Sequence, residues 1–177
     1  MSIEELSTRE MQALGALCLS AFCGHFAIMH SAIEELVTHQ VSLLGAANLP
    51  DWEGAGAILR LNGRGDPMPE DVPAAVPAEL KDSFFRLVDD TVEIGLIDMY
   101  GASTDQPRKY LQKAIEVLKA HRIAIPAVES VNVQQRPLRG EWGEPVAESV
   151  QREVLCRCMA LLDCRDRESA DDHPMES

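Results

Sequence analysis

The stretch MQALGALCLSAFCGHFAIM, from Met11 to Met29, decides the fold of this chain because it carries no formal charge at neutral pH. Its length approaches the ~20 apolar residues that a membrane-spanning helix needs. However, Gln12, Ser20 and His25 dilute it, and the residues before it are acidic. A signal peptide or a membrane helix normally has a basic flank. We therefore predict no membrane segment, but a helix buried on nearly all sides, either centrally in the fold or partly in a homodimer interface.

The start of this helix is marked by a capping signal. Ser7 stands three residues before Glu10, which is the spacing of a capping box. Apolar residues then recur at three- and four-residue steps as far as Leu43. The pattern predicts a helix over residues 8–44, or two helices if the chain breaks near Gly24.

Three further long helices follow from the same periodicity. The second covers residues 78–100, after Pro77. The third begins at Ser103, which has capping-box spacing to Gln106, and carries Pro107 in its first turn. It is locally basic, so it is expected to lie beside the acidic second helix. The last helix covers residues 145–164, where apolar positions again recur at helical spacing.

Irregular segments separate these helices. Asp51 is expected to cap a short helix that runs through Trp52 to Leu61. Prolines at positions 67, 69, 73 and 77 then predict a surface loop. Alternating residues over 129–135 allow one short strand. The predicted fold is mainly α, an irregular bundle of four principal helices with long Pro/Gly-rich loops and at most one short β element. We expect one helical domain over residues 1–164 and a disordered acidic tail over 165–177.

The charge of the chain narrows the range of partners. The net charge is −13, and residues 1–102 carry 16 acidic against 5 basic side chains. A surplus of carboxylates repels phosphate backbones, so direct binding of nucleic acid is not expected. The same field favours a protein partner with a basic surface, although it also serves simply to keep a protein in solution.

Two groups of metal-binding residue types have unsuitable spacing. On a continuous helix, Cys18 and Cys23 lie ~140° apart, because each residue turns ~100°. The same holds for His25 and His30, so tetrahedral ligation would need a break near Gly24. Near the end of the chain the pattern is Cys-x-Cys rather than Cys-x-x-Cys, and we expect packed thiols there. That group comprises Cys156, Cys158 and Cys164.

No catalytic constellation emerges from the remaining residues. His30 and Glu34, like Glu35 and His39, lie one helical turn apart, but the Glu-x-x-His pattern of di-iron bundles is missing. The sequence also lacks a Gly-x-Ser-x-Gly elbow and a phosphate-binding glycine loop. We therefore predict no cofactor, no metal and no enzymatic activity.

The candidate binding surface is the acidic face of the second helix. Carboxylates there, together with acids of the preceding loop, are suited to docking basic residues of a partner. The candidate protein-binding residues are Asp82, Asp89, Asp90, Glu93, Asp66, Glu70, Asp71 and Trp52.

The functional expectation is a cytoplasmic, non-enzymatic regulator or inhibitor that sequesters a protein partner, as bacterial immunity proteins and anti-activators do. This expectation is an analogy with a functional class of proteins and does not rest on resemblance to a particular family. One alternative is a helical metal- or ligand-binding sensor or enzyme that uses His25, His30, His39 or the cysteines. Another is a homodimeric structural protein joined through the first helix.

Overall fold

The computed structural model describes residues 2–131 and 142–163, and within these ranges the chain forms helices and no strand. The mainly α fold predicted from the sequence is confirmed. The α-helices are α1 (Thr8–His25), α2 (Ser31–Ser42), α3 (Leu49–Ala57), α4 (Asp71–Ala74), α5 (Lys81–Leu96), α6 (Gln106–Ala120) and α7 (Glu148–Leu162). Short 3-10 turns cover Ile3–Glu5, Leu43–Gly45, Ala78–Leu80 and Val128–Ser130.

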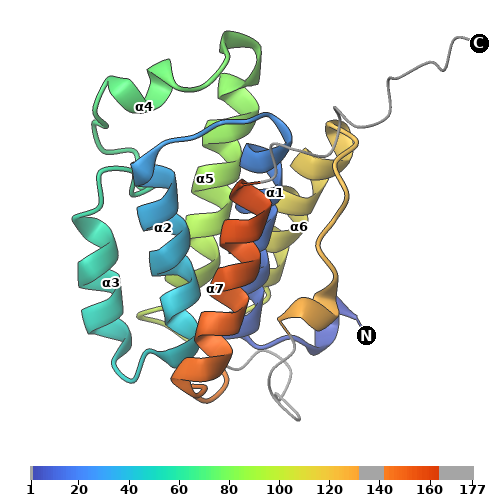
Figure 1. Cartoon of the computed structure of the whole chain (residues 1–177). Coiled ribbons are helices and arrows are strands. Elements are labelled where there is room, and N and C mark those ends of the chain that lie inside the picture. Colours follow the sequence, from blue (N-terminus) through green and yellow to red (C-terminus); the bar gives the residue numbers. More distant parts are fainter. Residues whose placement is uncertain (1, 132–141, 164–177) are drawn as a thin grey trace, which may run out of the picture.

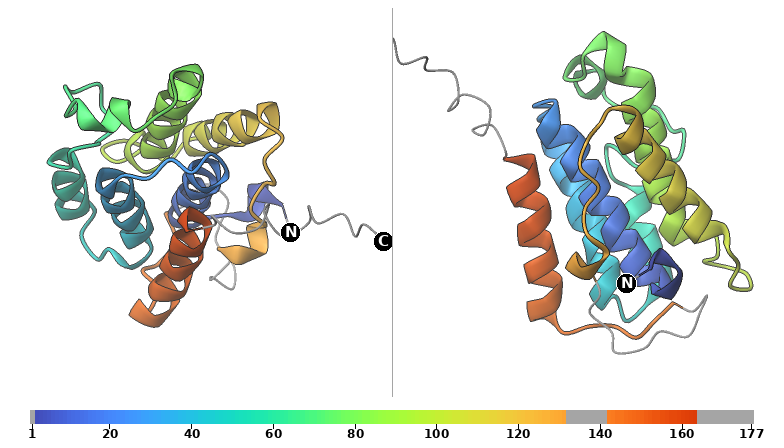
Figure 2. Two further views of the ribbon diagram at one scale, coloured as in Figure 1. Left: turned by 45° about the horizontal axis from the view of Figure 1, so that its top comes forward. Right: turned by 90° about the vertical axis from the view of Figure 1, so that its right-hand side faces the viewer.

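Helix α1 runs through the centre of the molecule, and α2, α5, α6 and α7 pack around it (Figures 1 and 2). Every residue from Thr8 to Gly24 is buried, which confirms the prediction of an enclosed helix. Because the rest of the chain already covers α1, this helix offers no surface for the homodimer considered from the sequence. The predicted capping box is also present, since Ser7 Oγ accepts from the Glu10 N–H at 3.3 Å and Glu10 Oε2 accepts from the Ser7 N–H at 2.9 Å.

The chain breaks after α1, as one of the two sequence-based alternatives proposed. Ala27 adopts a left-handed conformation, with φ of 52°, and turns the chain back on itself. His30 then caps α2 through Nδ1, which accepts from the Ala32 N–H at 3.1 Å. The alternative of one continuous helix over residues 8–44 is wrong.

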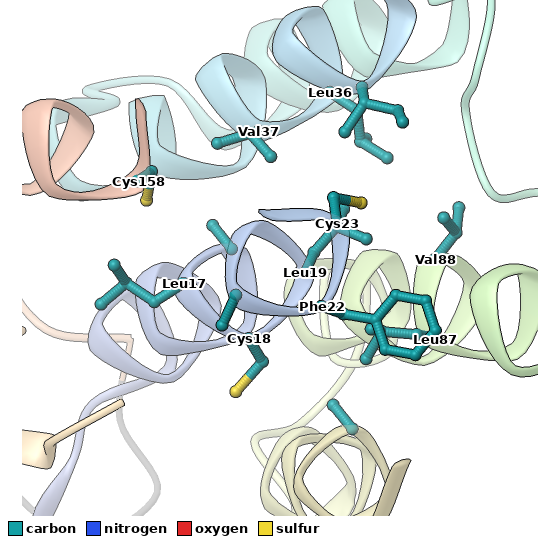
Figure 3. Close-up of a cluster of buried hydrophobic side chains, with 14 of the residues drawn as sticks. Leu17, Cys18, Leu19, Phe22, Cys23, Leu36, Val37, Leu87, Val88 and Cys158 are labelled. Carbon is teal, nitrogen blue, oxygen red and sulfur yellow. The ribbon is translucent and has the colours of Figure 1, made fainter. Parts of the chain in front are cut away.

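The core lies on both sides of α1. Phe22 of α1 packs in the region of Leu87 on α5, while Leu36 and Val37 of α2 lie across from Cys23 (Figure 3). Helix α7 approaches especially closely at Gly24, where an added Cβ would meet the Leu161 carbonyl oxygen at 1.8 Å. The absence of a side chain at this position therefore sets the separation of α1 and α7.

Helices α3, α5, α6 and α7 begin at other residues than the sequence predicted, and α5 starts at Lys81 rather than at residue 78. Helix α3 starts at Leu49 because Asn48, not Asp51, is its N-cap, and Asn48 Oδ1 accepts from the Asp51 N–H at 3.4 Å. It ends at Ala57 rather than at Leu61. Helix α6 starts at Gln106.

The start of α6 is fixed by the loop that follows α5. Thr104, rather than Ser103, provides the hydroxyl at this end, since its Oγ1 accepts from the Gln106 N–H at 3.1 Å. Asp98 is buried and accepts from the Thr104 N–H at 2.6 Å and from Thr104 Oγ1 at 2.7 Å. These bonds fold residues 98–104 back and end α5 at Leu96, four residues before the predicted boundary at residue 100.

The last elements also differ in extent. Helix α7 begins at Glu148 rather than at Pro145 and ends at Leu162. At the start of the strand predicted over 129–135, the structure has a 3-10 turn over Val128–Ser130. The rest of the predicted strand and the predicted tail over 165–177 lie outside the described residues. Among residues 2–131 and 142–163, every helix falls short of the length and apolarity required to traverse a bilayer.

Candidate functional site

A cavity of about 160 Å³ lies between α5 and the loop that follows α3. Its apolar surface comes from both segments, and Asp66 and Asp89, both exposed, belong to its lining. The lining residues are Leu61, Asn62, Gly63, Gly65, Asp66, Met68, Phe85, Val88 and Asp89. Two of the sequence-predicted binding residues, one from the loop and one from α5, are thereby brought to one site.

The loop reaches α5 because two of its residues are glycines in the left-handed region. Gly63 has φ of 63° and Gly65 has φ of 76°. A Cβ on Gly63 would lie 2.7 Å from a methyl carbon of Val92, so only glycine allows this approach. Asn62 then fixes the turn, since its Nδ2 donates to Asp66 Oδ2 at 2.8 Å and its Oδ1 accepts from the Arg64 N–H at 3.0 Å.

The one basic residue of this turn is engaged elsewhere. Arg64 forms an ion pair with the Glu53 carboxylate of α3 and donates from Nη2 to the Glu53 carbonyl oxygen at 3.0 Å. The hydrogen bond from Arg64 holds the pKa of the Glu53 carboxyl below its ordinary value. Tyr100 donates its hydroxyl to the same carboxylate at 3.2 Å. The positive charge of Arg64 is therefore compensated by Glu53 rather than by the carboxylates of the cavity.

The neighbouring acids Asp89 and Asp90 have different surroundings because consecutive helical residues point ~100° apart. Asp89 is exposed at the cavity. Asp90 is buried toward α6, with Oδ1 3.9 Å from Lys113 Nζ and Oδ2 3.6 Å from Arg86 Nε. Asp90 is thus an internal residue, and its prediction as a docking residue is wrong. The proposed proximity of α5 and the basic α6 is confirmed.

Both carboxyl groups have a raised pKa, for different reasons. Asp89 is exposed, but partial loss of hydration against the protein is the main cause at this residue, and the nearby charges of Asp90 and Glu93 add to it. At Asp90, loss of hydration outweighs the favourable charges of Lys113 and Arg86. The negative charge of Asp89 is therefore poorly compensated within the chain.

The other predicted acids lie around the cavity or farther along the surface. Asp82 and Glu93 are seven and four residues from Asp89, on the same side of α5; Asp82 is exposed and Glu93 is half-buried. Glu70 and Asp71 are exposed at the start of α4. Asp71 Oδ2 lies 3.1 Å from His30 Nε2, and this hydrogen bond lowers the pKa of Asp71.

Trp52 is not a surface residue. It is 7% exposed, and its ring stacks on the imidazole of His39 with centroids 4.5 Å apart. Its indole N–H donates to the His39 carbonyl oxygen at 2.9 Å. The prediction of Trp52 as a binding residue is wrong, because this side chain joins α3 to α2.

Burial, together with the charge of Arg64, lowers the pKa of His39 to about 4.

The cysteines mostly pack in the core. Cys18, Cys23 and Cys158 are buried, and burial raises the pKa of Cys18 and of Cys158 to about 12. Cys156 is exposed, so its prediction as a packed thiol is wrong, while Cys164 lies outside the described residues. In the described part of the chain, no three histidine, cysteine or acidic side chains gather as a metal site.

Sequence reasoning missed the apolar part of the cavity. Leu61, Met68, Phe85 and Val88 supply it, and the Asn-Gly-Arg-Gly pattern at residues 62–65 is a local signal of a tight turn that could have pointed to this region. The lining contains carboxylates and one amide but no histidine, cysteine, serine or lysine. The arrangement can therefore bind a cation that carries an apolar stem, whereas it provides no nucleophile with an adjacent base.

Comparison with protein-family models, with curated proteins and with solved structures finds no match for this chain.

Proposed function

We propose that this chain is a non-enzymatic, protein-binding regulator that docks on a basic surface of its partner, with one lysine or arginine side chain of the partner entering the cavity beside α5. The observation that carries this proposal is the combination of apolar walls with the carboxylates of Asp66 and Asp89 in one cavity. An immunity protein or an anti-activator acts by sequestering a partner in this general way.

The cavity matches a basic side chain in chemistry and in size. Lysine and arginine bury an apolar stem while the charged end stays near water. In the proposed complex Met68 and Phe85, which line the cavity, cover such a stem, and Asp66 and Asp89 accept hydrogen bonds from its charged end. The volume of about 160 Å³ is far above the need of a single water molecule and below the ~300–1,000 Å³ of sites for drug-sized ligands. One side chain is therefore a better occupant than a large ligand.

The charged residues around the cavity favour the same kind of partner, one with a basic surface. Asp82 and Glu93 extend the negative field along α5, and complementary charges raise association rates. Arg86 lies on this side of the helix as well, but its guanidinium is 3.6 Å from the Asp90 carboxylate, which offsets its charge. The net field at this face favours a cationic surface.

The pKa of Asp89 gives the proposed contact a pH dependence. Only the ionised carboxylate attracts a cation, and partial loss of hydration raises the pKa of this group. Binding should therefore weaken as the pH falls, and the loss should begin at a higher pH than for a fully hydrated aspartate.

Capture of the partner from a lysate of the source organism tests the proposal. The bait proteins are the wild type, a double variant Asp66→Asn/Asp89→Asn, and Glu148→Gln as a control, because Glu148 is exposed on α7, away from the cavity. A stoichiometric protein partner should bind the wild type and Glu148→Gln, more strongly at low than at moderate salt. The double variant should bind at least about tenfold more weakly, since it loses two charge-assisted contacts. If no stoichiometric partner appears, or if the double variant binds as well as the wild type, the proposal is wrong.

A further inference from the structure

Three helices share a buried polar network on the other side of the Asn62–Arg64 turn. Gln12 of α1 donates from Nε2 to the Thr91 carbonyl oxygen at 2.9 Å. Gln40 of α2 donates from Nε2 to Thr91 Oγ1 at 3.0 Å. Gln12 is 0% exposed and Gln40 is 1% exposed. Both amide nitrogens are thus held by one threonine of α5.

The two amide oxygens of this network have no donor. In the described part of the chain, neither Gln12 Oε1 nor Gln40 Oε1 has a hydrogen-bond partner, and the same holds for Arg64 Nε. Buried carbonyl oxygens are almost always hydrogen-bonded in proteins, because they lose their hydration on folding. These three atoms therefore need a hydrogen-bonding partner from outside the described chain.

All three side chains line one small cavity of about 10 Å³, together with Trp52 and His39. The Gln12 oxygen faces this region, since a Cβ on Gly95 would meet both that oxygen, at 2.6 Å, and the Trp52 ring, at 2.8 Å. A single water molecule needs a cavity of roughly 10–15 Å³ and two to four polar partners. The volume is at the lower limit for one water molecule, and the three unpaired polar atoms match the hydrogen-bonding groups of water.

We infer that this cavity is a binding site for one structural water, which donates to Gln12 Oε1 and to Gln40 Oε1 and accepts a hydrogen bond from Arg64 Nε. Water supplies two donors for the two carbonyl oxygens and an acceptor for the guanidinium N–H. An ammonium or a metal cation would suit the carbonyl oxygens, but it has no lone pair to accept the hydrogen bond of Arg64 Nε. An apolar occupant would leave all three atoms unpaired.

The site has a consequence for the neighbouring acidic cavity. Asn62 lines both cavities, and Arg64 follows it in the same turn. The water therefore connects α1 and α2 to the turn that forms one wall of the acidic cavity. This inference is independent of the proposed function, because it rests only on the buried side chains.

A high-resolution crystal structure of the full chain tests the inference directly. An ordered water should lie within about 2.7–3.2 Å of both glutamine oxygens. A density map without this water, or one in which the two glutamine side chains bond directly to each other, overturns the inference.

Oxygen-17 relaxation dispersion, which counts long-lived internal waters, provides a second measurement. Gln40→Leu should lose about one such water relative to the wild type, since it removes one of the two oxygens. Gln112→Leu is the matched control, because Gln112 is exposed on α6, and it should keep the wild-type count. An unchanged count in Gln40→Leu contradicts the inference. If Gln40→Leu does not fold, the presence or absence of the water in the wild-type crystal structure tests the inference.

Discussion

Replacing Gly24 by alanine tests the closest approach of two helices, α1 and α7. The added Cβ would lie 1.8 Å from the Leu161 carbonyl oxygen, whereas ordinary contact begins at 3.4 Å. Helix α7 would therefore have to move by roughly 1.6 Å, the difference between these two distances. A backbone atom cannot rotate away as a flexible side chain can. The shift would also open the buried contacts of Val154, Cys158 and Leu162.

The expected change in the free energy of unfolding follows from two opposing effects. Overpacking of a core costs about 1–3 kcal/mol, and a clash with backbone belongs at the upper end. Alanine regains up to ~1 kcal/mol as a better helix former than glycine. We expect Gly24→Ala to lower the free energy of unfolding by about 2 kcal/mol.

Urea unfolding of the full chain measures this change through the transition midpoint at constant slope. Gly54→Ala is the matched control, because Gly54 is also helical but its Cβ would meet nothing within 4 Å. This control should gain about 0.5–1 kcal/mol from helix propensity alone. A Gly24→Ala protein as stable as the wild type would refute the reasoning about the α1–α7 contact.

Three further predictions concern buried polar groups and can be checked by the same unfolding assay. The pKa of His39 is lowered to about 4, so this imidazole is neutral in the folded state and takes up a proton on unfolding. Stability should therefore fall as the pH drops from 6.5 towards 4, by about 1–2 kcal/mol after allowance for solvent screening, and His39→Gln should flatten this dependence. Arg9 is buried and donates to the carbonyl oxygens of Leu43, Ala46 and Gly143. Arg9→Lys should therefore lower the free energy of unfolding by roughly 2–4 kcal/mol. An unchanged midpoint of urea unfolding would contradict this prediction. Asp98→Asn should lower the free energy of unfolding by about 1–2 kcal/mol, because both carboxylate oxygens accept hydrogen bonds from Thr104. Asp90→Asn should leave the free energy of unfolding unchanged or raise it, since the fold disfavours the charge of Asp90. A larger loss of stability in Asp90→Asn than in Asp98→Asn would contradict both expectations.

The central helix was predictable because its signal is local. An uncharged stretch of this length can be buried on all sides only at the centre of a helical body, and Ser7 with Glu10 marks its start within four residues of sequence. The start of α3 was not predictable in the same way. Asn48 and Asp51 are both good capping residues, and the choice between them depends on where the chain leaves α2.

The candidate site was predictable only in part because its geometry depends on distant contacts. Sequence reasoning selected Asp66 and Asp89, but helical periodicity alone did not show that Asp90 faces α6. Trp52 was misassigned because its stacking partner His39 lies on another helix. The apolar walls of the cavity join loop residues to residues of α5 that lie at least 17 positions farther along the chain, and no local pattern reports such a contact.

The most direct test of the central claim is an NMR titration of the full chain with two short peptides, one containing a single lysine and the other norleucine in its place. The two peptides share an apolar stem and differ in the charged end. At millimolar concentrations, the lysine peptide should shift the backbone amide signals of Gly63, Gly65 and Asp89, while the norleucine peptide and the Asp66→Asn/Asp89→Asn variant should show no such shifts. Equal shifts with both peptides, or shifts only at other residues, would contradict the assignment of this cavity as the binding site for a basic side chain.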